Sequence, residues 1–105
     1  YADKEVAPDV LARLQKYERR GFDVILYTAR NMRTYAGRVG RINAETAPVL
    51  VDWLGEHDVP YTELHFGKPW CGHDGFYVDD RAIRPDEFTE LSHDEIRAIV
   101  EDAER

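Results

Sequence analysis

Apolar residues along the chain occur in short groups with two different spacings, which predict alternating helices and strands. Residues 8–20 place apolar side chains at i, i+4 and i+7 between Pro8 and Gly21, so they predict an amphipathic helix. Residues 22–27 read Phe-Asp-Val-Ile-Leu-Tyr, a short run that is too apolar for a surface strand. We therefore expect a buried parallel strand that ends at Thr28.

The middle of the chain continues this alternation after a polar interruption. Residues 29–41 carry four arginines and two glycines and predict a long functional loop. Apolar pairs at the i, i+4 spacing in residues 49–54 predict a helix that ends near His57. Residues 63–66 predict a second short strand, and residues 75–78 predict a third buried strand.

The end of the chain predicts one more helix and completes the fold class. Ser92 and Glu95 have the spacing of a capping box, so we expect a helix to begin there. The order is helix, strand, helix, strand, strand, helix, an alternation typical of a layered α/β sheet. The 105 residues have room for a single domain, residues 1–105, with a modest core.

Composition excludes several classes of protein. The net charge of −7 and the isoelectric point near 5.0 argue against a general nucleic-acid binder, which needs a basic face. Cys71 is the only cysteine, so no internal disulfide can form. The sequence contains no apolar run of membrane-helix length, and residues 1–15 lack the apolar region of a signal peptide. We expect a cytoplasmic protein that binds neither membranes nor nucleic acids.

Polar side chains that could hold a phosphate follow each of the three predicted strands. Thr28 ends the first strand, Lys68 follows the second within Gly-Lys-Pro, and Asp79 and Asp80 end the third. Because the carboxyl ends of parallel strands meet at one edge of a sheet, we expect these groups to lie together. They supply a hydrogen bond, charge neutralisation and a site for Mg²⁺, which prefers carboxylates and water.

Each of these residues also has an ordinary structural explanation. A threonine after a strand often forms a turn, Gly-Lys-Pro is commonly a solvated turn, and Asp-Asp often begins one. The arginines of residues 29–41 fit a solvated surface, but they also suit recognition of an anionic substrate group, with Arg30 the best placed. The joint placement at strand ends is what favours the functional interpretation.

Other chemistries have less support in the sequence. The segment Cys71-Gly72-His73-Asp74 lacks the partner ligands that a zinc site needs. Ser92 is the only serine, and its surroundings do not form the nucleophile elbow of a serine hydrolase.

The three strand-end motifs resemble those of the haloacid dehalogenase superfamily of phosphohydrolases. Residues 25–30, Ile-Leu-Tyr-Thr-Ala-Arg, are similar to its second motif; residues 66–69, Phe-Gly-Lys-Pro, to its third; and residues 77–80, Tyr-Val-Asp-Asp, to its fourth. The resemblance spans nearly the whole chain and looks most like small bacterial phosphatases of capsular or surface-polysaccharide biosynthesis. It implies a three-layer, Rossmann-like parallel sheet with flanking helices.

The resemblance also implies roles for individual residues. Thr28, with Ala29 and Arg30, would bind the transferring phosphoryl group, Lys68 would hold it beside the nucleophile, and Asp79 with Asp80 would bind Mg²⁺. The implied reaction is hydrolysis of a small phosphorylated metabolite, such as a sugar phosphate, through an aspartyl-phosphate. The substrate would be shielded by the arginine-rich loop or by a neighbouring subunit of a homo-oligomer.

One motif of that superfamily has no counterpart in the chain. The first motif, Asp-x-Asp, supplies the nucleophile and the general acid/base, and no Asp-x-Asp occurs in the 105 residues. In the superfamily this motif lies on a strand between the strand ending in Thr28 and the strand ending in Asp79. Together with a start at Tyr1 rather than Met, this predicts an amino-terminally truncated domain that is inactive as it stands.

Two other classes of function share parts of this pattern. A receiver-type signalling module also combines acidic residues, threonine and lysine, but there the acidic pair precedes the other two, whereas here it comes last. A non-catalytic relative that binds a phosphorylated ligand or partner remains an alternative, because it needs no nucleophile.

Overall fold

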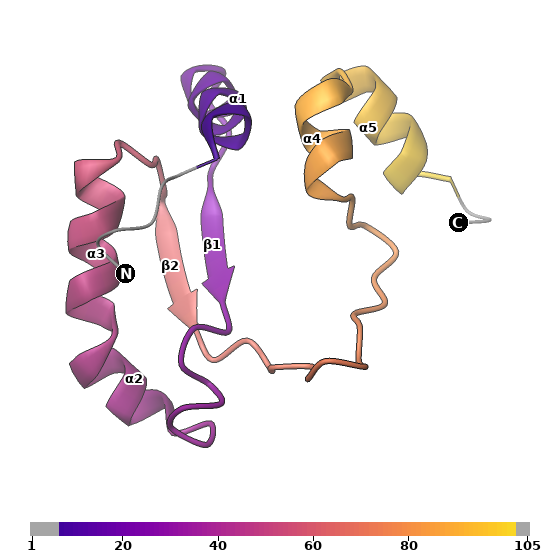
Figure 1. Cartoon of the computed structure of the whole chain (residues 1–105). Coiled ribbons are helices and arrows are strands. Elements are labelled where there is room, and N and C mark those ends of the chain that lie inside the picture. The colour runs from indigo at the N-terminus through magenta and orange to yellow at the C-terminus, as the bar shows by residue number, and fades with distance from the viewer. Residues whose placement is uncertain (1–6, 103–105) are drawn as a thin grey trace.

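A computed structural model describes residues 7–102 of the chain as a mixed α/β fold with a small parallel sheet and flanking helices (Figure 1). The elements follow in the order α1 (Pro8–Arg19), β1 (Ile25–Thr28), α2 (Val39–Glu45), α3 (Ala47–Glu56), β2 (Glu63–Phe66), α4 (Pro85–Glu90) and α5 (His93–Val100). Within the described residues, no helix combines the length and apolar character needed to cross a membrane.

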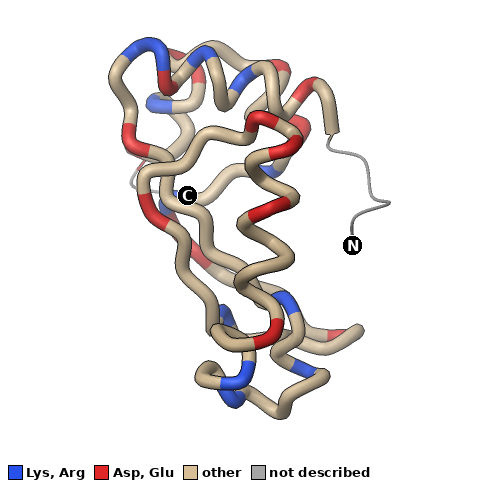
Figure 2. The backbone as a smooth tube through the Cα atoms, turned by 90° about the vertical axis from the view of Figure 1, so that its left-hand side faces the viewer, with Lys and Arg blue, Asp and Glu red and all other residues tan. Residues whose placement is uncertain are grey.

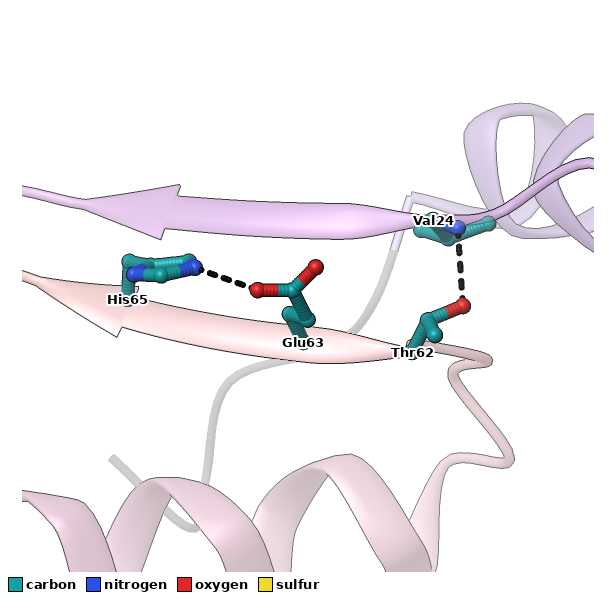
Figure 3. Close-up of polar contacts among 4 residues, drawn as sticks. All are labelled: Val24, Thr62, Glu63 and His65. Carbon is teal, nitrogen blue, oxygen red and sulfur yellow. Dashed lines mark hydrogen bonds and ion pairs between the residues drawn. The ribbon is translucent and has the colours of Figure 1, made fainter.

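The sheet consists of β1 and β2, which run parallel and in register from Ile25 opposite Glu63 to Thr28 opposite Phe66. Thr62 fixes the start of this pairing twice, because its hydroxyl accepts a hydrogen bond from the amide of Val24 at 3.1 Å and its own amide donates to the carbonyl of Val24 at 2.7 Å (Figure 3). The parallel arrangement brings the carboxyl ends of both strands to the same edge.

The main core lies between the sheet and the helical pair α2 and α3, which run along the side of β2 (Figure 1). Ile42 is fully buried, and Leu50 and Leu54 are nearly so, in agreement with the predicted i, i+4 spacing of the last two. Pro48 sits in the first turn of α3, where its missing amide costs no helical hydrogen bond.

A second, aromatic cluster joins α1 to the two carboxyl-terminal helices. The ring of Tyr17 stacks on Phe88 with centroids 5.5 Å apart and meets Phe22 edge-on at 5.0 Å, and His93 contacts Phe22 at 5.0 Å. The side chain of Arg13 donates a hydrogen bond to the carbonyl oxygen of Thr89 beside this cluster. These contacts hold α4 and α5 against α1 rather than against the sheet.

The capping box predicted for the last helix is confirmed. The hydroxyl of Ser92 accepts a hydrogen bond from the amide of Glu95 at 3.1 Å, and the carboxylate of Glu95 accepts one from the amide of Ser92 at 3.0 Å. The second of these bonds stabilises the charged carboxylate and lowers the pKa of Glu95 below its ordinary value.

Two predictions about strands are wrong. Residues 75–79 are extended without pairing as a strand, and Phe76 and Val78 are 81% and 89% exposed. The first strand is parallel as predicted but not buried, since Ile25 and Tyr27 are 56% and 54% exposed. Both failures have one cause: within the described residues, nothing pairs with the free edge of β1 or with residues 75–79, and a strand without a neighbour cannot bury its side chains.

Two helices were missed by the sequence analysis. The helix α2 begins in the last residues of the expected loop, residues 29–41, and extends to Glu45. The short helix α4 begins at Pro85. The carboxylate of Glu87 accepts a hydrogen bond from the amide of Arg84 at 2.9 Å at the start of this helix. Neither segment is long enough to show a clear 3.6-residue period, which is why the pattern of apolar residues did not reveal them.

The unpaired edge leaves the molecule more open than a chain of this length normally is. The radius of gyration is 15.3 Å, whereas about 13 Å is typical of a compact domain of this length. Figure 1 shows the extended segment after β2 leading away from the sheet toward α4.

Because so few apolar side chains are fully buried, we expect Ile42→Ala to destabilise the fold severely. Deleting the buried part of an isoleucine costs about 2–5 kcal/mol of unfolding free energy, a large share of a small domain's total. Urea unfolding followed by circular dichroism measures this loss. Val49→Ala, at a position that is 50% exposed on the neighbouring helix, is the control and should cost far less; equal losses would contradict the assignment of the core.

Candidate phosphate site

The carboxyl ends of β1 and β2 bring two of the predicted site residues together. The amide of Lys68 donates a hydrogen bond to the carbonyl oxygen of Thr28 at 3.1 Å, although the residues are far apart in sequence. Gly67, between the strand and Lys68, has φ of 91°, a left-handed conformation that glycine adopts without strain. The chain turns there so that Lys68 lies beside the end of β1.

Thr28 is half-buried, and its side chain organises the turn that follows β1. The hydroxyl oxygen accepts a hydrogen bond from the amide of Arg30 at 3.0 Å, across Ala29. This bond is the ordinary turn role expected for such a threonine, and it leaves the hydroxyl hydrogen available to a ligand. The arginine-rich segment starts at this turn. Its first residues therefore follow Thr28, whose carbonyl oxygen is bonded to the amide of Lys68.

The ammonium group of Lys68 lies over an aromatic ring. Its Nζ lies 4.3 Å from the centroid of Tyr77, and the hydroxyl of Tyr77 donates a hydrogen bond to the carbonyl oxygen of Pro69. Partial removal of the phenol from water, together with its hydrogen bond to Cys71, raises the pKa of Tyr77 above its ordinary value. The ring therefore stays neutral and holds Lys68 without neutralising its charge.

Asp79 and Asp80 lie on the extended segment that faces the sheet. Lys68 and Asp79 line one cavity of about 1050 Å³, with Tyr27 on one wall. The carboxylate of Asp79 accepts a hydrogen bond from the amide of Arg81 at 2.8 Å, an Asx-type turn that keeps other lone pairs free. Asp80 is exposed and, like Thr28, does not line this cavity.

The walls of this cavity are apolar as well as charged. Tyr27 from the free edge of β1 and Phe76 and Val78 from the extended segment face it, and all three are largely exposed. A second cavity of about 410 Å³ continues along Val24 and Ile25 toward the aromatic cluster. The two cavities thus lie against Ile25 and Tyr27 of β1, and Ile83 lines both of them.

The donor groups of this region suit magnesium better than zinc. Among the described residues, no group of three or more His, Cys, Asp or Glu side chains is arranged to hold a metal ion. Mg²⁺ is commonly held by only one or two carboxylates, with waters and substrate oxygens completing its shell. Asp79 is a carboxylate of this kind that lines the cavity with Lys68, whereas Asp80 does not line it. Cys71 is an exposed free thiol.

Trp70 and Arg33 also lie in this region; the sequence predicted an anion-recognition role for the arginines of residues 29–41, which include Arg33, but no site role for Trp70. The guanidinium carbon of Arg33 lies 5.0 Å from the centroid of the Trp70 ring, which joins the arginine-rich segment to the loop that follows Lys68. His73 contacts Trp70 edge-on at 5.6 Å. The position of Trp70 two residues after Lys68 was the available signal.

Comparison with known proteins places the chain in a family. A crystal structure of a structural-genomics target from Vibrio cholerae matches it with a TM-score of 0.93 and 50% sequence identity, over 96% of this chain and 82% of that chain. The chain belongs to the same family as this Vibrio cholerae protein. No family model and no curated protein matches the chain. The Vibrio cholerae relative shares the architecture described above, and the activity has to be inferred from the residues.

Proposed function

We propose that the chain is the core of a magnesium-dependent phosphomonoesterase of the haloacid dehalogenase type, acting on a small phosphorylated metabolite. The observation that carries this proposal is the hydrogen bond between the amide of Lys68 and the carbonyl of Thr28. This bond joins the backbones of two separate motifs at one strand edge, and Lys68 lines a cavity together with Asp79.

In this mechanism the residues of the chain bind and neutralise the phosphoryl group. The hydroxyl of Thr28 and the amides after it donate hydrogen bonds to phosphoryl oxygens, and Lys68 offsets their negative charge. Asp79 and Asp80 would hold Mg²⁺, which stabilises charge on the transferring group when it is bound. Tyr77 positions Lys68 through its ring.

The nucleophile of the proposed reaction has to come from an Asp-x-Asp strand. The free edge of β1 supports this requirement, because the cavities beside it offer an unpaired backbone on one side and apolar side chains on both. An apolar strand placed there would end near Thr28 and Lys68. Its first aspartate would attack phosphorus to form an aspartyl-phosphate, a mixed anhydride, while its second aspartate protonates the departing alcohol. The second aspartate would then take a proton from water, which hydrolyses the anhydride, releases phosphate and regenerates the first aspartate.

Resemblance of the Thr-Ala-Arg and Gly-Lys-Pro-Trp stretches to bacterial surface-polysaccharide phosphatases supports a sugar phosphate as the substrate. Such a substrate is a cytoplasmic metabolite, consistent with the acidic composition of the chain. The arginine-rich segment beside Lys68, or a second subunit, would shield it from water.

The proposal is tested by expressing the natural reading frame, including any residues before Tyr1, beside the 105-residue chain. We expect hydrolysis of an aryl phosphate only from a form that carries Asp-x-Asp, and only with Mg²⁺, so that chelation with EDTA abolishes turnover and added Mg²⁺ restores it. Release of inorganic phosphate is the readout. Turnover by the 105 residues alone would contradict the aspartyl mechanism.

The alternative, a non-catalytic module that binds a phosphorylated ligand, is favoured by one observation: the 105 residues contain a hydroxyl, an ammonium group and an acidic pair but no Asp-x-Asp. It predicts that the natural protein binds phosphate in a manner that requires Lys68 and yet hydrolyses nothing. A natural amino terminus without Asp-x-Asp, found by mass spectrometry, would leave this alternative standing.

A further inference from the structure

The arginine-rich segment between β1 and α3 is a basic region in an otherwise acidic protein. Between Asp23 and Glu45 the sequence contains four arginines and no aspartate or glutamate, although the whole chain has a net charge of −7. This segment and α2 form the lower end of the molecule in Figure 1, and several Lys and Arg positions gather at the same end in Figure 2.

The backbone of this segment is fixed by its own hydrogen bonds. The amide of Gly37 donates to the carbonyl of Met32 at 2.8 Å, and the side-chain oxygen of Asn31 accepts from the hydroxyl of Thr46 at 2.8 Å. Asn31 and Ala36 have φ of 60° and 51°. A left-handed conformation costs alanine about 1–2 kcal/mol, so the shape is maintained against local strain.

Two arginines in this segment, Arg33 and Arg41, lie over aromatic rings. Arg33 lies over Trp70 and Arg41 lies 4.9 Å from the centroid of Tyr35. Within residues 7–102, no carboxylate forms an ion pair with either guanidinium. A guanidinium that lies over a ring face without an ion-pair partner still has N–H donors that an oxyanion can bind in a bidentate manner.

Arg33 is the arginine that this arrangement connects to the phosphate site. Trp70, the ring beneath it, follows Lys68 by two residues, and Lys68 is hydrogen-bonded to Thr28. The loop that carries Lys68 therefore also carries Trp70, the ring that the Arg33 guanidinium contacts. A ligand that fills the first can extend over the ring toward the second.

From this geometry we propose that the substrate carries a second anionic group, a carboxylate or another phosphate. The guanidinium of Arg33 binds this group while it lies over the ring of Trp70. This inference rests on the proposed function, because it places the second anion beside the phosphoryl group held by Thr28 and Lys68. It narrows the substrate class to molecules with two separate anionic groups, such as acidic phosphosugars or diphosphates, and assigns Arg33 and Trp70 to specificity.

Calorimetric titration of the protein expressed from its natural reading frame, at low ionic strength and without Mg²⁺ so that no turnover occurs, tests this inference with three probes: orthophosphate, pyrophosphate and phosphoglycolate. We expect the two probes with a second anion to bind at least about tenfold more tightly than orthophosphate, since each adds a charge-assisted bidentate contact. Arg33→Gln should remove this advantage and leave orthophosphate binding unchanged. Loss for pyrophosphate alone identifies a second phosphate, and loss for phosphoglycolate alone identifies a carboxylate.

Two further variants separate this inference from the proposed function. Lys68→Gln should weaken all three probes, and Arg19→Gln, on the exposed end of α1, should weaken none. An orthophosphate site that depends on Lys68 but shows no Arg33-dependent preference would overturn the second-anion inference alone. Orthophosphate binding that is undetectable, or unaffected by Lys68→Gln, would overturn the proposed function and this inference with it.

Discussion

Asp79→Asn is expected to abolish magnesium-dependent phosphate release in the form of the protein that carries Asp-x-Asp. The substitution keeps the size of the side chain and its carbonyl acceptor for the amide of Arg81, so the local turn should survive. What it removes is the negative charge that Mg²⁺ requires. Phosphate release over a range of Mg²⁺ concentrations, up to tens of millimolar, measures the loss.

Asp74→Asn is the matched control for this prediction. Asp74 lies on the loop before the extended segment, is exposed and does not line the cavity shared by Lys68 and Asp79. Its substitution should leave turnover close to that of the unmodified protein. Activity that survives Asp79→Asn at full rate would remove Asp79 from the metal site.

Lys68→Ala is expected to slow hydrolysis by at least about a hundredfold, the usual effect of losing one preorganised group that stabilises transition-state charge. The ammonium group lies over the ring of Tyr77, and among residues 7–102 no carboxylate forms an ion pair with it, so its charge can act on the phosphoryl group. Because the stabilisation grows as charge develops, the loss should appear mainly in kcat. Steady-state kinetics with an aryl phosphate separates kcat from KM.

Lys68→Arg and Lys16→Ala complete this experiment. Arginine keeps the charge with a different shape, so it should recover part of the rate, whereas Lys16 on α1 lies far along the chain from the strand ends and its loss should have no effect. A drop in stability alone would lower the amount of active protein without changing kcat per folded molecule. An unchanged kcat in Lys68→Ala would contradict the assigned role.

The sequence predicted the parts of the fold that depend on local signals. Three elements were predicted from neighbouring residues alone, and the structure contains all three. They are the helix with Leu50 and Leu54 at the i, i+4 spacing, the helix that begins at the Ser92 and Glu95 capping box, and the strand that ends at Thr28. The pairing of Thr28 with the Lys68 segment also followed, because parallel strands meet at their carboxyl ends.

The remaining differences arise from long-range partners. Phe76 and Val78 have the composition of a buried strand, but composition cannot supply the neighbour that a strand must hydrogen-bond to. For the same reason the site is partly assembled: Lys68 and Asp79 share a cavity, whereas Asp80 does not line it. The stacking of Arg33 on Trp70 depends on the relative placement of two loops, which no spacing in the sequence encodes.

The free edge of β1 has a practical consequence for work with this chain. Unpaired amides and carbonyls next to exposed Ile25 and Tyr27 form a template on which another copy can add a strand, and such edges drive precipitation in concentrated solution. Dilute samples, or a charged residue introduced at Ile25, would suppress this self-association. A poor yield of the isolated 105 residues would then result from self-association through the free edge of β1 rather than from a failure of the helices to fold.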